Sequence, residues 1–167
     1  MHIIATTRFN SKTWSENERW KNKNAWKGCI YGTPMLIKES IGLNVPMFIL
    51  EMQNDTNTVK GIGLVRNYIA KDKRYRVYAD GNYNRYIYKS EYRIDRTEMS
   101  KNELLVIKMF DVLLFKGSRH LKRARGITAV PDWISKNKHI NFIKFFRKLF
   151  RDRYNLTRQR SFSFSKY

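Results

Sequence analysis

The stretch Pro46–Val65, PMFILEMQNDTNTVKGIGLV, indicates the architecture of this chain most directly. Residues 46–52 are a short apolar run with turn residues on both sides, which is typical of a buried strand. Residues 54–57, NDTN, are a turn signal, and residues 59–65 follow as a second strand. Side chains alternate along a strand, so both glycines of Gly61-Ile-Gly63 share one face. Their missing side chains leave room for a bulge, or for close approach of a backbone or a base.

Two helices are predicted further along the chain. Ser100 and Glu103 form a capping box ahead of an apolar run, and Gly117 suits the position just after a helix end. We therefore expect a helix over residues 101–116, packed on the sheet because most of its circumference is apolar. Aromatic and aliphatic residues spaced three and four apart predict a second, basic helix over residues 136–153.

Shorter elements complete the prediction. Asp80-Gly-Asn82 lies between the alternating segments 75–79 and 83–94, which predicts a β-hairpin. Ser15-Glu-Asn-Glu18 fits the capping box of a short helix. Residues 127–130 suit a last short strand before a proline. Strands and helices in this order predict the α+β class.

Residues 29–67, and within them residues 46–67, resemble the PUA-like superfamily, which includes EVE, YTH and ASCH domains. The resemblance implies a small, strongly bent β-barrel that reads nucleic acid. We accordingly expect a PUA-like domain over residues 1–135, a basic amphipathic helix over residues 136–155 and a flexible basic tail over residues 156–167. The ASCH motif Gly-x-Lys-x-x-Glu-x-Arg is absent, which argues against an ASCH-type catalytic function.

Positive charge is concentrated at the C-terminal end of the chain. Residues 116–167 hold 15 of the 34 Lys and Arg but only two of the 14 acidic residues, so they carry +13 of the formal net charge of +20. Self-repulsion among so many like charges opposes compaction. Nucleic acid is the commonest polyanion that would neutralise them, because each phosphate contact releases condensed counterions.

Two basic segments are candidates for phosphate contacts, namely the loop after the first predicted helix and the polar face of the second helix. Their basic residues are Arg119, Lys122, Arg123, Arg125, Lys144, Arg147, Lys148 and Arg151. The second helix has three competing roles. In the first, its Phe face packs on the domain and its basic face contacts phosphates. In the second it lies on an anionic membrane surface, and in the third it docks in a groove of a partner protein. We prefer the first, because it fits the Arg/Ser-rich tail.

Aromatic side chains supply the second half of the predicted interface. Stacking on an aromatic ring contributes about 1–3 kcal/mol for each unpaired base, and recognition of unpaired bases favours RNA over DNA. The candidates for base stacking or a base pocket are Trp14, Trp20, Trp26, Tyr31, Tyr86 and Tyr88. The PUA-like resemblance implies a cage near Trp26 and Tyr31.

Other chemistry has little support in the sequence. The three histidines lack the spacing of metal ligands, and neither a dinucleotide fingerprint nor a P-loop is present, so no metal or other cofactor is expected. Cys29 is the only cysteine and suits a small buried apolar position. No apolar run approaches the ~20 residues that cross a bilayer, so no membrane partner is expected.

These features predict a non-catalytic nucleic-acid-binding protein, with RNA favoured. One alternative is a structural component of a ribonucleoprotein or virion, whose basic tail threads between partner proteins. Another is a small metal-dependent nuclease that uses Glu51 with Asp55 or Asp95. The first residues lack the apolar stretch of a signal peptide, so we expect an intracellular location, in cytoplasm or nucleus, or a place inside a virion. Frequent Asn, Lys, Ile and Tyr resemble the composition of proteins from large DNA viruses.

Overall fold

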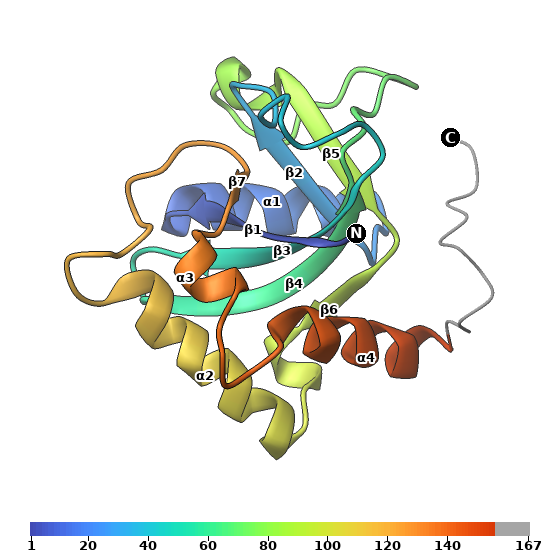
Figure 1. Cartoon of the computed structure of the whole chain (residues 1–167). Helices are drawn as coiled ribbons and strands as arrows, with labels where there is room; N and C mark the ends of the chain where they lie inside the picture. The colour runs from blue at the N-terminus through green and yellow to red at the C-terminus, as the bar shows by residue number, and fades with distance from the viewer. Residues whose placement is uncertain (156–167) are drawn as a thin grey trace.

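In the computed structural model, residues 1–155 are described and form an α+β fold built on two β-sheets (Figure 1). The larger sheet has the strand order β6-β4-β3-β1-β7, in which β1 and β3 are parallel and the other neighbours antiparallel. Its strands are β1 (Ile3–Phe9), β3 (Pro46–Gln53), β4 (Thr58–Arg66), β6 (Arg93–Asp95) and β7 (Thr128–Ala129). The smaller sheet pairs β2 (Cys29–Thr33) with β5 (Tyr86–Ser90). Within residues 1–155 the strands therefore form two sheets and no closed barrel.

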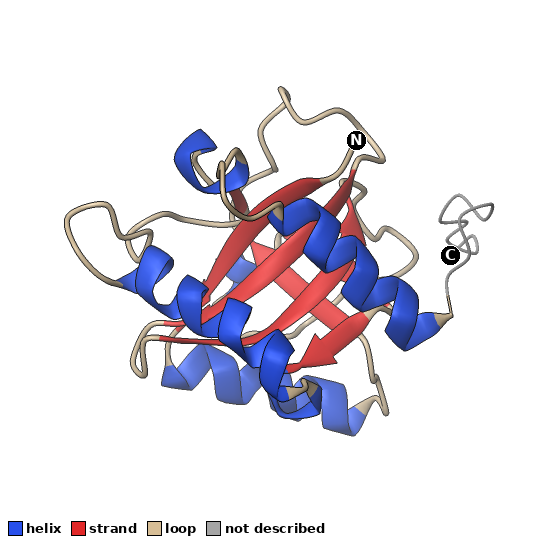
Figure 2. Cartoon of the chain, turned by 60° about the horizontal axis from the view of Figure 1, so that its bottom comes forward, coloured by secondary structure: helices blue, strands red, loops and turns tan. Residues whose placement is uncertain are grey.

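Helices cover both faces of the larger sheet. The longer helices are α1 (Ser11–Lys23), α2 (Lys101–Phe115) and α4 (Phe142–Tyr154). The short ones are α3 (Asp132–Ser135), η1 (Gly81–Asn84) and η2 (Arg96–Glu98). Figure 2 shows α2 and α4 lying across one face of the larger sheet. The β2–β5 pair and α1 cover the opposite face (Figure 1).

Strand β3 contributes side chains to two separate cores. Phe48, Leu50 and Met52 pack with apolar residues of α2 and α4, whereas Met47 and Ile49 pack under α1 and the β2–β5 pair. A strand covered on both faces needs apolar residues at successive positions, which explains the uninterrupted apolar run at the start of β3. The predicted strands 46–52 and 59–65 are thus confirmed as β3 and β4.

Helix α2 also agrees with its prediction. Ser100 Oγ accepts from the backbone N–H of Glu103, whose carboxylate accepts from the N–H of Ser100, which is the expected capping box. Gly117 has φ +77°, a conformation that glycine adopts at little cost. Ile107, Phe110 and Leu114 are buried against the sheet.

The predicted hairpin over residues 75–94 is wrong. Residues 75–79 form no strand, and β5 pairs with β2 rather than with them. The reason is Asn84, whose Oδ1 accepts from the backbone N–H groups of Val77 and Tyr78, both at 2.9 Å. The Asn84 side chain therefore accepts from two backbone N–H groups that would otherwise donate to carbonyl groups of a neighbouring strand.

Two helix boundaries also differ from prediction. Helix α1 starts at Ser11 instead of after Ser15, because Asn10 and Thr13 form the capping box. Strand β1, which precedes this helix, was not predicted. The second basic helix starts at Phe142, where the Asn141 side chain accepts from Lys144 N, so residues 136–141 are not helical. Its Phe face packs in the core, as expected. The predicted tail, residues 156–167, lies outside the described residues.

Candidate nucleic-acid interface

A basic cleft lies beside the long connection between β4 and β5. Two neighbouring hollows, of about 650 Å³ and 560 Å³, share a wall formed by residues 73–76, 78 and 79. The connection supplies most of the lining, and α1 supplies the remainder of the smaller hollow. Six basic side chains line the two hollows: Arg19, Lys23, Lys73, Arg74, Arg76 and Arg85. We call this region the basic cleft.

Buried tyrosines hold the connecting segment in place. Tyr75 is 3% exposed and its hydroxyl donates to the Asp72 carboxylate at 2.7 Å. Tyr78 is also buried, and its hydroxyl accepts from Asn17 Nδ2 at 3.0 Å, which ties the segment to α1. Burial, and for Tyr75 also the Asp72 carboxylate, raises the pKa of both phenols above the ordinary value, so they stay neutral. Arg74 and Arg76 flank Tyr75 in the sequence, and both are exposed.

Little negative charge lines the basic cleft, and the nearby Asp72 carboxylate, which accepts from Tyr75, pairs with Lys89. Glu16 is the one carboxylate in the lining of the two hollows, and it accepts a hydrogen bond from Ala79 N at 3.3 Å. Within residues 1–155, none of the six basic side chains belongs to an ion pair. Like charges brought together without counter-charges repel one another, so this arrangement favours an anionic ligand.

The phosphate contacts predicted from the sequence lie elsewhere. Lys144, Arg147, Lys148 and Arg151 are exposed on α4, on the opposite face of the larger sheet from the basic cleft. Lys148 and Arg151 each pair with Asp152, which reduces their availability for phosphate.

The basic loop after α2 is fastened to the edge of the larger sheet. Arg8 donates from Nη1 to Leu121 O and from Nη2 to Gly126 O, each at 2.9 Å, and burial lowers its pKa to about 10. Asn54 Nδ2 donates to the carbonyl of Lys122 at 3.0 Å. The basic side chains of this loop are Arg119, Lys122, Arg123 and Arg125, and Lys122 alone among them is partly buried. They are not among the residues that line the basic cleft.

Of the three tryptophans predicted to stack on bases, one lines the basic cleft and two pack against other side chains. Trp20 lines the smaller hollow of the basic cleft. Trp14 packs edge-on against Phe9, and the Arg93 guanidinium lies 5.9 Å from its ring centroid. The Lys89 ammonium lies 5.0 Å from the Trp26 ring.

The three tyrosine candidates lie on the β2–β5 pair. Tyr31 and Tyr88 are only 2% and 1% exposed, so burial corrects their prediction: neither ring has a free face for a base. Tyr86 is partly exposed on β5, with the Arg85 guanidinium 5.7 Å from its ring centroid.

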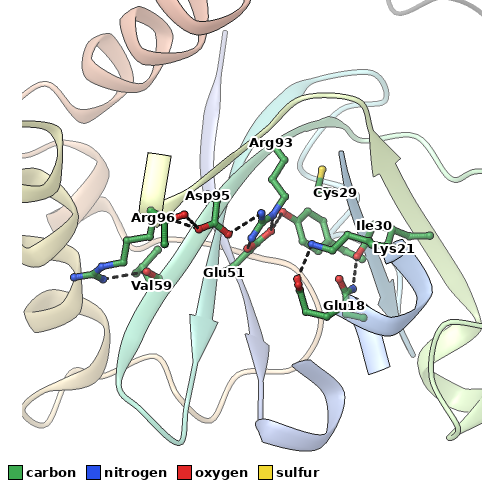
Figure 3. A network of polar contacts seen from close by, with 12 residues as sticks. Glu18, Lys21, Cys29, Ile30, Glu51, Val59, Arg93, Asp95 and Arg96 are labelled. Carbon is green, nitrogen blue, oxygen red and sulfur yellow. Dashed lines mark hydrogen bonds and ion pairs between the residues drawn. The ribbon is translucent and has the colours of Figure 1, made fainter. Parts of the chain in front are cut away.

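A buried ionic network crosses the sheet beneath α1 (Figure 3). Arg93 of β6 donates from Nε and Nη2 to the two carboxylate oxygens of Glu51, at 2.9 and 2.7 Å, and from Nη1 to Asp95 at 3.0 Å. The hydroxyl of Tyr31 donates to Glu51 Oε1 at 2.8 Å. Burial alone would lower the pKa of Arg93, but the attraction of Glu51 raises it overall, so the guanidinium remains protonated.

The two glycines of β4 provide the space for this network. A Cβ atom on Gly61 would lie 2.7 Å from Arg93 Nη2 and 2.8 Å from Glu51 Oε2. A Cβ atom on Gly63 would lie 2.2 Å from the Tyr31 hydroxyl oxygen. The close approach predicted for Gly61-Ile-Gly63 is therefore that of buried polar side chains of the same molecule.

The carboxylates proposed for a nuclease are already bound to other groups of the protein. Glu51 and Asp95 both bind Arg93, and Asp55 accepts from the backbone N–H and the hydroxyl of Ser11 at 2.7 and 2.8 Å. Among residues 1–155 no group of three His, Cys, Asp or Glu side chains is placed to hold a metal ion.

Cys29 lies beside the network and is 1% exposed. Burial, together with the negative charge of Glu51, raises the pKa of its thiol to about 12. The thiolate is the reactive form, so we expect no reaction with iodoacetamide at pH 8 in the native protein. One equivalent should react after unfolding in guanidinium chloride, as measured by intact mass. Complete labelling of the native protein within minutes would contradict this enclosed position.

The sequence-based prediction missed the basic cleft, although the run Lys71-Asp-Lys-Arg-Tyr-Arg76 places an aromatic ring among basic residues, as the C-terminal segment does. Within the described part of the chain, no helix is both long and apolar enough to cross a bilayer.

No protein-family model, curated protein or solved structure matches this chain, and its function is therefore inferred from the geometry of the basic cleft and the buried network.

Proposed function

We propose that this protein binds nucleic acid in the basic cleft, with RNA preferred, and that it has no catalytic activity of its own. The observation that carries the proposal is the set of six basic side chains around two hollows, none of them ion-paired within residues 1–155. The partly exposed ring of Trp20 among these basic side chains favours a nucleic acid over an acidic protein. The absence of catalysis is supported by the engagement of Glu51 and Asp95 with Arg93.

The resemblance of residues 29–67 to PUA-like domains belongs to the same proposal. It adds the reading of nucleic acid that the family implies, here on two packed sheets instead of a closed barrel. An intracellular location, or a place inside a virion, goes with a nucleic-acid partner.

A second candidate function is favoured by the basic side chains on the opposite face of the sheet. The exposed cations of α4 and of the loop 119–125 give the molecule a second positive surface. A protein with cations on two faces can contact two anionic segments, as a structural component of a ribonucleoprotein or virion does. A component of this kind binds oligonucleotides without preference, whereas a reader discriminates between them.

Salt dependence of binding tests the proposal. We expect a fluorescently labelled, single-stranded RNA of about 12 nucleotides to bind with an affinity that falls roughly 50-fold between 50 and 200 mM salt, as for about four phosphate contacts. The double substitution Arg74→Ala/Arg76→Ala should weaken binding about 10- to 100-fold and reduce the slope of log K against log salt by about 1.4. Fluorescence anisotropy gives both quantities.

Two control variants remove the same charge elsewhere. Lys101→Ala/Lys108→Ala changes exposed residues of α2, beyond the sheet from the basic cleft, and should leave affinity nearly unchanged. Arg123→Ala/Arg125→Ala tests the basic loop directly. A salt-independent affinity would reject nucleic-acid binding through phosphates, and a larger effect of the loop variant would move the interface away from the basic cleft. Polyglutamate should compete poorly, because it carries charge without bases.

A further inference from the structure

Trp20 is partly buried, packs against the core beneath α1 and lines the basic cleft. It lines the smaller hollow and lies tilted by 55° to Tyr75, with ring centroids 5.9 Å apart. The indole N–H of Trp26 donates to Cys29 O at 3.1 Å, whereas that of Trp20 makes no hydrogen bond within residues 1–155 and is not sealed from solvent. Trp20 thus offers ring surface and a hydrogen-bond donor in the same hollow.

Basic side chains from α1 and from the connecting segment line the same hollow as Trp20. Arg19 and Lys23 are four residues apart on α1, so their side chains are neighbours along one face of the helix. Like charges at this spacing destabilise a helix slightly, unless an anion lies between them. Lys73 and Arg74 line the same hollow from the connecting segment.

From this arrangement we infer that the smaller hollow holds one base of an unpaired strand against Trp20, so that the ligand of the basic cleft is single-stranded RNA rather than a duplex. The inference rests on the proposed function and specifies its ligand. The bases of an RNA duplex stack on one another and present only their edges, so none could place its face on a ring inside a hollow. A hollow of about 560 Å³ is in the size range of small-molecule sites and has room for one base with its sugar.

Substitutions of Trp20 separate stacking from charge. Trp20→Leu keeps an apolar side chain for packing but removes the aromatic face, and it should weaken binding of an oligo(U) of about 12 nucleotides roughly tenfold or more. The salt slope should not change, because no phosphate contact is lost. Trp20→Phe retains a ring and should bind within about threefold of the native protein.

Fluorescence supplies a readout that a merely structural role of Trp20 would not give. Oligo(U) should quench tryptophan emission of the native protein, and Trp20→Phe should abolish most of the quenching while binding persists. Trp133→Phe, on α3, changes another partly exposed tryptophan and should leave the quenching unchanged. Thermal unfolding by circular dichroism checks that each variant folds.

Strand preference completes the test. Oligo(U) should bind at least about tenfold more tightly than the same strand paired with oligo(A). Equal affinity for the duplex, or native affinity of Trp20→Leu, would overturn the inference while leaving the proposed function intact, provided the arginine variants still lower the salt slope. Absence of binding to either RNA at 50 mM salt would remove both proposals together.

Discussion

Replacing Glu51 with glutamine is expected to remove about 3–5 kcal/mol from the free energy of unfolding, which is a large part of the 5–15 kcal/mol typical of a domain. The side chain of Arg93 is 9% exposed and loses its main counter-charge in this variant. An amide presents an N–H₂ group where one carboxylate oxygen now accepts from Arg93, so two donors would face each other. The melting temperature should fall by roughly 10 °C or more, measured by circular dichroism.

Two further variants show whether the loss comes from an unpaired buried cation. Glu51→Leu/Arg93→Met removes both charges and should be more stable than Glu51→Gln, because no unpaired cation remains in the core. Asp132→Asn breaks an ion pair whose side chains are 75% and 78% exposed, and should change stability by no more than about 0.5 kcal/mol. A loss below about 1 kcal/mol for Glu51→Gln would show that water reaches Arg93.

Local patterns predicted the elements whose stability is itself local. Helix α2 was predicted because Ser100 and Glu103 fix its start within four residues. The strand pair β3–β4 was predicted because its apolar runs flank a turn. Long-range pairing was not predicted: β5 was assigned to a hairpin, and its actual partner is β2, more than 50 residues earlier in the chain. Asn84, two residues before β5, takes over the donors that would have formed the hairpin, but no pattern in this segment specifies β2 as the partner.

The candidate site shows the same division. Side-chain type identified Trp20 as a candidate for stacking, and the structure places it in the basic cleft. Aromatic residues look alike in a sequence whether buried or exposed, so Tyr31 and Tyr88 were assigned to the interface although both lie in the core. Arg19 of α1 and Arg74 of the connecting segment line the same hollow only because α1 packs beside that segment. The basic cleft is therefore a property of tertiary structure.

Replacing Gly63 with alanine is the second substitution with a large expected effect. The new Cβ atom would lie 2.2 Å from the Tyr31 hydroxyl oxygen and 2.7 Å from Cys29 Sγ, far inside contact distance. Tyr31 cannot yield without giving up its 2.8 Å hydrogen bond to Glu51. Overpacking costs about 1–3 kcal/mol and a lost buried hydrogen bond about 1–2 kcal/mol, so we expect a loss of about 2–5 kcal/mol in the free energy of unfolding, measured in urea. Gly81→Ala is the matched control, because nothing lies within 4 Å of the added atom.

A double-mutant cycle with Tyr31→Phe assigns this cost to the network. Phenylalanine lacks the oxygen that the new methyl group would strike, so Gly63→Ala should be at least about 1 kcal/mol less costly in the Tyr31→Phe background than in the native protein. Tyr31→Phe alone should cost about 1–2 kcal/mol, because Glu51 keeps both bonds from Arg93. Additive costs would mean that the backbone of β4 moves instead of Tyr31. In that case the glycines would serve the path of the strand, and the space they leave for Glu51 and Arg93 would be incidental to their role.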